Sequence, residues 1–287
     1  GDILFGGNMN GWRVMANTIK MRIALRMADV DSSTASSVFN SAYNSGVISS
    51  GSDLHYPYLT SDAFDNPWQD RFQTRYDFVV SEKFIDHLKA TGDPRLPYMA
   101  DGTAISNGTD YVGLEYGLEN PGVLETLLSG IDGRIIYDGT QQGGWIATYS
   151  EVCFAMAEAY ERGWTTVGDT QTWVRLGVKA SCERWGVSSS AAAAYANSIT
   201  VGSNAMETIA MEKWVDMFLQ GYESWTEWRR LDYPALSPPA AAITGTGVPV
   251  RNGYGGLVPT QNKASYDAAV AAQGPDNQDT KLWWDTK

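Results

Sequence analysis

Apolar residues recur every three or four positions near the start of the chain. They fall at Trp12, Met15, Ile19, Ile23, Met27 and Val30, whereas Thr18, Arg22, Arg26 and Asp29 lie on a second stripe. This spacing predicts an amphipathic helix. A second helix is predicted from Ser33 to Tyr43, because Asn44-Ser-Gly46 favours a left-handed cap. The two segments together predict a helical hairpin.

Similar patterns predict further helices along the chain. Ser81–Ala90 is followed by the breakers Gly92 and Pro94, and Tyr149–Arg162 by Gly163. Helices are also expected at Thr170–Trp185 and around Ala191–Asn197. The longest helix is predicted from Asn204 to about Leu231, with Asn204 and Glu207 as a capping box. Its stripe comprises Ala210, Trp214, Met217, Gly221, Trp225 and Trp228, and Pro234 ends it.

The remaining segments lack sustained periodicity. Residues 46–80 and 93–147 are predicted to be irregular, and the Gly- and Pro-rich last fifty residues to be extended chain and turns. The predicted fold class is therefore all-α, with antiparallel helical pairs, long irregular loops and little strand.

Composition narrows the classes of function. The chain has 287 residues and a net charge of −12, which disfavours nucleic acid and anionic membrane surfaces as partners. Charged residues interrupt the apolar stretch from Trp12 to Val30, so it is neither a signal sequence nor a membrane span. Cys153 and Cys182 leave a single disulfide open, although the apolar surroundings of Cys153 favour a buried free thiol.

Residues suited to catalysis are sparse. Glu151 and Glu158 lie seven positions apart on one predicted helix, about 10 Å along its axis, which is at or beyond the separation that an inverting glycosidase uses. Pairing with arginines in a helical core is the preferred interpretation. His55 and His87 have no third metal ligand, and no nucleotide- or phosphate-binding motif occurs, so we expect no cofactor and no enzyme.

Aromatic residues in the irregular segments are the best candidates for ligand contact, because no helical stripe explains their burial. Stacking platforms for sugar rings are predicted at Tyr56, Trp68, Tyr111 and Tyr116. The nearest polar partners for sugar hydroxyls are Asn66, Arg71 and Asp110. The alternative for each ring is that it pins its loop to the helical body.

Several collinear motifs resemble the SusD/RagB group of outer-membrane nutrient-binding lipoproteins, in particular its SusD-like branch. They are Gly11–Arg26, Gly92-Asp-Pro-Arg-Leu-Pro97, Tyr149–Ala159, Glu212–Gly221, Trp225-Thr-Glu-Trp-Arg-Arg230, Val248-Pro-Val-Arg251 and Leu282-Trp-Trp-Asp285. The resemblance implies tetratricopeptide-like helical hairpins and a shallow site for oligosaccharides or other nutrients. It also implies a SusC-like TonB-dependent transporter as partner, and a lipid-anchored location on the outer membrane at the cell surface.

Family members carry a lipidated cysteine and further helices before the Trp12 segment. We therefore expect residues 1–287 to form a single SusD-like helical domain without those N-terminal helices and without the anchor. Within it, Arg22, Arg26, Arg229 and Arg230 are expected to pair with Glu151, Glu158 or Glu227.

The leading hypothesis is non-catalytic capture of oligosaccharide for delivery to the transporter. A helical glycan-degrading hydrolase is one alternative, and a helical-repeat scaffold that binds only protein is the other.

Overall fold

The computed structural model of the chain describes residues 1–61, 63–74, 76–119, 121–136, 144–242 and 247–286. Parts of the predicted irregular segments 46–80 and 93–147, and of the C-terminal region, lie outside the described residues. The helices are α1 (Met9–Arg26), α2 (Ser32–Asn44), α3 (Pro67–Phe72), α4 (Glu82–Thr91), α5 (Leu96–Met99), α6 (Gly133–Ile136), α7 (Tyr149–Glu161), α8 (Thr170–Arg184), α9 (Ser189–Ser198), α10 (Ala205–Asp216), α11 (Gly221–Leu231), α12 (Val258–Gln261) and α13 (Lys263–Gln273).

Strand structure within the described residues is limited to a short antiparallel pair and isolated bridges. Strand β1 (Leu54–His55) pairs with β2 (Trp145–Ala147), and two short 3₁₀ turns lie at Ala104–Ser106 and Glu125–Leu127. The predicted all-α class with little strand is confirmed.

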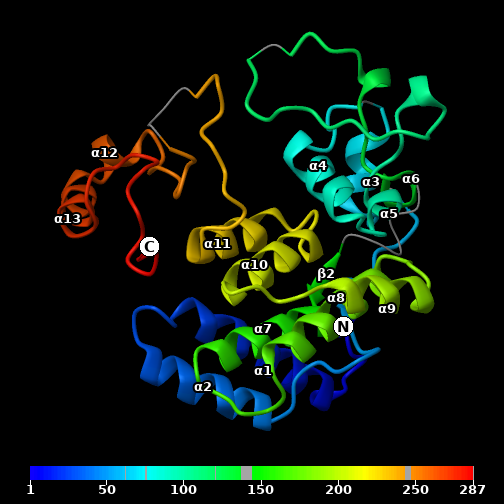
Figure 1. The fold of residues 1–287 in the computed structure, drawn as a ribbon. Coiled ribbons are helices and arrows are strands. Elements are labelled where there is room, and N and C mark those ends of the chain that lie inside the picture. The colour runs from blue at the N-terminus through cyan, green and yellow to red at the C-terminus, as the bar shows by residue number, and fades with distance from the viewer. Residues whose placement is uncertain (62, 75, 120, 137–143, 243–246, 287) are drawn as a thin grey trace.

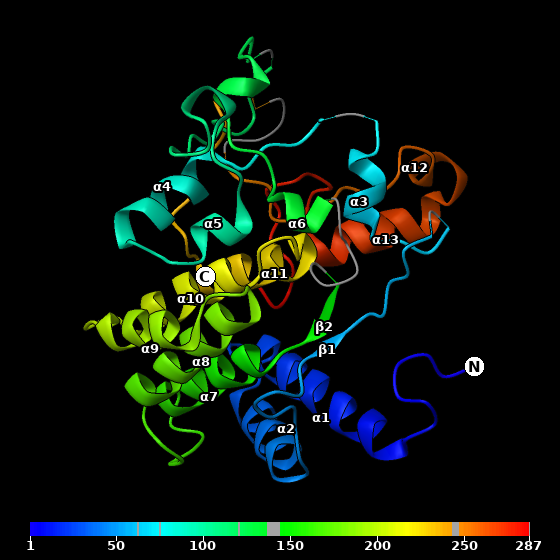
Figure 2. The ribbon, with the colours of Figure 1, turned by 90° about the vertical axis from the view of Figure 1, so that its right-hand side faces the viewer.

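Helical hairpins form the lower body of the molecule, in which α1 packs on α2, α7 on α8 and α8 on α9 (Figures 1 and 2). Side-chain caps begin several of these helices: Asp31 for α2, Thr148 for α7 and Asp169 for α8 each accept a backbone N–H of the first turn. The sequence therefore specified the starts of these helices locally.

A network of buried ion pairs joins the helices. Arg22 of α1 donates to Glu151 of α7 at 2.5 and 2.8 Å, and the buried Arg230 of α11 holds Glu158 of α7. Because charges removed from water need partners, these pairs fix the helices relative to one another. The predicted structural role of Glu151 and Glu158 is confirmed.

Two predicted ion pairs were wrong. Arg26 pairs with Glu223 of α11, a partner that was not predicted. Arg229 instead donates to the Val250 carbonyl at 2.8 Å, and its guanidinium lies over the rings of Trp225 and Trp284, 4.0 and 4.6 Å from their centroids. Its planar cation thus stacks between two aromatic rings.

A second layer, α3 to α6, lies above the hairpins in Figure 1 and has its own apolar core, which includes Ile85, Leu88, Met99 and Ile135. It is joined to the lower body through α10: Phe84 of α4 packs edge-on to Trp214 and stacks on Phe218. This joint places one side of α4 beside α10, where the cleft described below opens.

Two details of the predicted helices were wrong. Helix α1 buries Thr18, Met21, Ala24 and Leu25, whereas Ile23 of the predicted stripe is 48% exposed. The predicted long helix is broken at residues 217–220, where Leu219 has a φ of +67° and Phe218 turns to stack on Phe84. Tertiary packing here overrides a continuous helical pattern.

The C-terminal region contains α13, although extended chain was expected. The segment Lys263–Gln273 is rich in alanine, which is the strongest helix former. Figure 1 shows α12 and α13 set apart from the hairpins. No described helix is both long and apolar enough to cross a bilayer.

Candidate functional site

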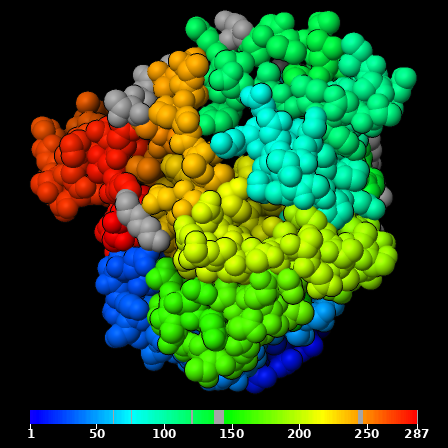
Figure 3. All heavy atoms as spheres, viewed as in Figure 1, coloured from blue at the N-terminus to red at the C-terminus, as the bar shows by residue number. Residues whose placement is uncertain are grey.

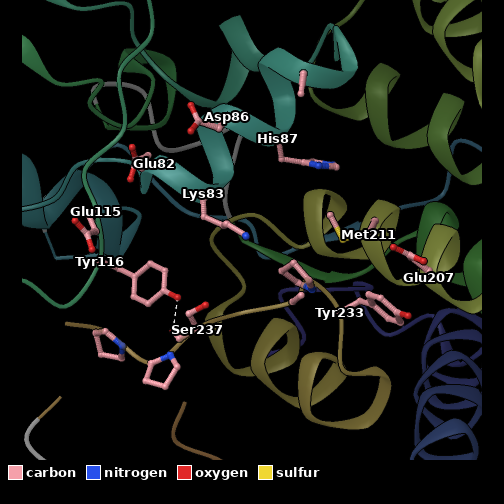
Figure 4. A pocket seen from close by; sticks show the side chains of 15 residues that line it. Glu82, Lys83, Asp86, His87, Glu115, Tyr116, Glu207, Met211, Tyr233 and Ser237 are labelled. Carbon is pink, nitrogen blue, oxygen red and sulfur yellow. Dashed lines mark hydrogen bonds between the residues drawn. The ribbon is translucent and has the colours of Figure 1, made fainter. Parts of the chain in front are cut away.

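A cleft of 620 Å³ opens between α4, α10 and the segment 233–239 (Figure 4). The space-filling view shows the surface hollowed where this segment passes α4 (Figure 3). The lining residues are Glu82, Lys83, Asp86, His87, Ala90, Glu115, Tyr116, Glu207, Met211, Tyr233, Pro234, Ala235, Ser237, Pro238 and Pro239.

Helix α4 divides its residues between the core and the cleft. Phe84, Ile85 and Leu88 are buried on one side. Lys83, His87 and Ala90 follow one another at three- and four-residue spacing on the other side, so they face the cleft together. Glu207 and Met211 of α10 line the opposite side one turn apart.

Two tyrosines enter the cleft and are held by hydrogen bonds. The Tyr116 hydroxyl donates to the Ser237 carbonyl at 2.5 Å, a contact drawn in Figure 4. The Tyr233 hydroxyl accepts from Asn204 Nδ2 at 2.8 Å. Next to Tyr116, Gly117 has a φ of +72°, and a Cβ there would lie 2.1 Å from Pro239 Cβ. The glycine therefore allows the chain at Tyr116 to approach the chain at Pro239 this closely.

The charged residues of the cleft are exposed and unpaired. Within the described part of the chain, Glu82, Asp86, Glu115 and Lys83 form no ion pair, although Lys83 projects toward the middle of the cleft in Figure 4. His87 packs near Trp214, with 5.6 Å between ring centroids, and burial lowers the pKa of its imidazole. Its side chain is therefore largely neutral near pH 7.

This arrangement suits the binding of a hydroxyl-rich molecule. Carboxylate oxygens and the lysine amine can hydrogen-bond to hydroxyls, while tyrosine and proline rings provide apolar faces for the C–H side of a sugar. Within the described ranges, no group of three or more His, Cys, Asp and Glu side chains could hold a metal ion.

The predicted ligand residues are distributed over several places. Tyr116 lines the cleft, whereas Tyr56 lines a separate hollow of 720 Å³ together with Tyr58, Leu59 and Phe64. The walls of that hollow are almost entirely apolar apart from Asp65, so they offer sugar hydroxyls few partners. Trp68 lies in a third hollow of 330 Å³, edge-on to Phe78.

The other four predicted residues lie outside the cleft. Asn66 is buried and caps α3 through the Trp68 N–H, and Arg71 lies 5.8 Å from the centre of the Phe78 ring. Lys89 bonds both the Asp110 carboxylate and the Tyr111 carbonyl, and the Tyr111 ring packs against the core around α4. The structure thus does not bring the seven residues together.

Several cleft residues were missed by sequence reasoning. Lys83 and Asp86 could have been found as the polar side of the predicted helix Ser81–Ala90. Tyr233 and Pro239 carried no such signal, because only the folded chain brings their segment opposite α4.

Comparisons with known proteins identify the family and the fold of the chain. Residues 1–255 match the SusD-like family described as starch-binding and associating with the outer membrane. Among curated proteins there is no match.

Solved structures cover the whole chain. A chitin-binding protein is 26% identical with a TM-score of 0.83, and 67% of its length is covered. A SusD homologue from Bacteroides thetaiotaomicron is 24% identical with a TM-score of 0.87, and 68% of its length is covered. A chitin-binding SusD homologue from Flavobacterium johnsoniae is 24% identical with a TM-score of 0.83, and 66% of its length is covered. This chain therefore spans about two thirds of the length of these structures.

Proposed function

We propose that this chain, which belongs to the SusD-like family of starch-binding proteins associated with the outer membrane, binds an oligosaccharide in the cleft between α4 and α10. Members of this family are carbohydrate-binding proteins without catalytic activity, and this chain is one of them. The observation that carries the proposal is the combination of two anchored tyrosines with unpaired polar side chains around one cavity.

The role of Tyr116 follows from its anchoring. The bond to Ser237 limits the movement of the ring before the ligand arrives, so little conformational entropy is lost when a sugar packs on it. Tyr116 is the predicted ligand residue that this site retains. For the others, Trp68 and Tyr56 remain proposed contacts only for a ligand that extends beyond the cleft.

The test is calorimetric titration of starch-derived and chitin-derived oligosaccharides into wild type and three variants. Tyr116→Ala should weaken binding roughly three- to ten-fold through the loss of a stacked ring. Tyr116→Phe keeps the ring and should bind nearly as wild type does. Tyr222→Ala removes a ring that is 79% exposed and lies outside the cleft, so it is the matched control.

Two outcomes would count against the site. Equal affinity of wild type and folded Tyr116→Ala for the oligosaccharides would show that the cleft is not the binding site. Release of reducing sugar from any of the oligosaccharides would contradict non-catalytic binding.

For the cellular role we propose that the full protein, lipid-anchored at the cell surface, passes the oligosaccharide to a SusC-like TonB-dependent transporter. The association of the family with the outer membrane supports this proposal. Co-purification of the tagged protein with a TonB-dependent channel from outer membranes tests it. Recovery of the protein without such a channel from membranes that contain one would refute it.

A further inference from the structure

The cleft carries an excess of negative charge that its own residues do not neutralise. Four carboxylates line it, from Glu82, Asp86, Glu115 and Glu207, against the single amine of Lys83. Burial lowers the pKa of the His87 imidazole, which reduces its positive charge relative to an exposed histidine. Four negative groups and one positive group leave a formal charge of −3 around a 620 Å³ cavity.

Several buried carboxylates elsewhere in the fold are paired with cations, unlike those of the cleft. Glu158, Glu227 and Glu212 each meet an arginine or a lysine in the core. In the cleft, within the part of the chain that the structure describes, Lys83 lies among carboxylates and yet forms an ion pair with none of them. The negative side chains are therefore left to interact with whatever enters the cleft.

The positions of the carboxylates indicate how the positive charges of a ligand would have to be spaced. Within the described residues they do not converge into a group that could hold a metal ion. Glu82 and Asp86 lie one turn apart on α4, Glu115 lies on the Tyr116 segment, and Glu207 lies across the cleft on α10. A single compact cation cannot approach all of them, whereas a chain of separate positive charges can.

The apolar walls add a second requirement. The rings of Tyr116, Tyr233, Pro234, Pro238 and Pro239 line the cleft together with the charged groups and supply it with apolar faces. Such faces favour a ligand with flat C–H surfaces, which sugar rings have and a linear polyamine lacks.

We propose that the ligand of the cleft is an amine-bearing glycan, an oligosaccharide of 2-amino-2-deoxy sugars whose amines are free and protonated rather than acetylated. This inference rests on the proposed function, because it names the class of oligosaccharide that the same cleft takes. Each protonated amine adds attraction to the carboxylates, and a neutral sugar of the same shape forms only the stacking and hydroxyl contacts.

The experiment compares glucosamine oligosaccharides with fully N-acetylated oligosaccharides of equal length, by calorimetry at about pH 6, where aspartate and glutamate side chains are ionised. The amine form should bind about ten-fold tighter at low ionic strength, and the preference should shrink as salt is raised. Spermine, a polyamine without ring faces, should bind more weakly than the amino-sugar oligosaccharide.

Variants locate the effect in the cleft. Glu82→Gln and Asp86→Asn, at exposed positions of α4, should each weaken binding of the amine form about three-fold and that of the acetylated form by less, because an amide still hydrogen-bonds to hydroxyls. Lys83→Gln should strengthen binding of the amine form. Asp267→Asn removes the same charge from the exposed face of α13 and should change neither affinity.

The outcomes separate this inference from the proposed function. If the acetylated or a starch-derived oligosaccharide binds in a Tyr116-dependent way and the charge variants have no effect, the amine-bearing class is wrong and glycan binding in the cleft stands. If none of the oligosaccharides binds, both are wrong. Equal affinity for spermine would overturn the requirement for a sugar.

Discussion

Replacing Arg230 by methionine is the sharpest test of how this fold is held together. The Arg230 side chain is almost fully buried and joins two carboxylates, Glu158 of α7 and Glu227 of α11. Its Nη2 donates at 2.6 Å to Glu158 and at 2.6 Å to Glu227. Methionine fills much of the same space but offers neither charge nor donors, so both carboxylates lose their shared partner.

The cost follows from what remains around each carboxylate. Breaking a buried ion pair by removing one partner costs about 3 to 5 kcal/mol. Here Glu158 keeps Arg162 at 2.8 Å and Glu227 keeps Lys213, so the loss should lie at the lower end, about 3 kcal/mol. Arg175→Met is the matched control, because within the described residues Arg175 donates only to the carbonyls of Ile199 and Asn197. It should lower the free energy of unfolding by less than about 1 kcal/mol.

Urea unfolding followed by circular dichroism measures both variants. With a slope of about 3 kcal/mol per molar urea, the Arg230→Met midpoint should fall by about 1 M. The double variant Arg230→Met, Glu158→Gln should lose less free energy of unfolding than the sum of the two single variants. The reason is that a neutral amide replaces the Glu158 carboxylate, which has lost its arginine partner. A loss for Arg230→Met no larger than for Arg175→Met would refute this account of the network.

The pH dependence has a definite sign. Burial by itself raises the pKa of Glu158, but the Arg230 guanidinium outweighs it and holds that pKa below its usual value. A carboxylate with a lowered folded-state pKa adds stability that is present above the unfolded pKa, and this stability is lost as pH falls through the folded value. In Arg230→Met this lowering is lost. The difference in stability between wild type and variant should therefore stay nearly constant from pH 7 to about pH 5 and narrow as the pH falls below about 4.

Three further predictions follow. Burial raises the pKa of the free thiols Cys153 and Cys182 to about 12, so a thiol reagent at neutral pH should label neither in the folded protein and both in urea; rapid labelling of the native chain would contradict this. Asp232 caps α11 with a φ of +61°, so Asp232→Gly should raise stability by about 0.5 to 1 kcal/mol, and an unchanged or lower Tm would show that the side chain compensates. Trp68 is half-buried against the core, so Trp68→Ala should lower stability by about 2 kcal/mol in urea unfolding. It should weaken binding only of oligosaccharides long enough to pass beyond the cleft, and a loss for short ones would place Trp68 in the main site.

The helices could be predicted where local signals agree. The predicted starts of α7 and α8, at Tyr149 and Thr170, are the observed ones, and glycines end α4 and α7 as expected. The break between α10 and α11 could not be predicted in the same way, because Met217, Gly221 and Trp225 continue the helical stripe across it. The break depends on Phe218 stacking on Phe84, a residue far away in the chain.

The candidate site could be predicted only in part, for a related reason. The rule that favours aromatic residues in irregular segments selects Tyr116, which lines the cleft. The same rule also selected Tyr111, whose ring packs on the core, and Trp68 beside it. Irregular backbone raises the chance that a ring meets a ligand, but only the tertiary structure separates a ring that lines a cavity from one that fixes a loop.

The motif that most clearly resembles the family, Trp225-Thr-Glu-Trp-Arg-Arg230, belongs to the scaffold. Trp225 donates to the Pro249 carbonyl, Trp228 to the Pro234 carbonyl, and Arg230 enters the buried network. The bond from Trp228 holds Pro234 against the end of α11, and the chain from there to Pro239 forms one wall of the cleft. In the proposed binding mode the motif therefore acts only by positioning that wall, and the charges and rings proposed to select a ligand lie on α4, on the Tyr116 segment and on the wall itself. Exchanging Glu82 or Asp86, which are exposed, would alter the charge of the cleft without disturbing the core.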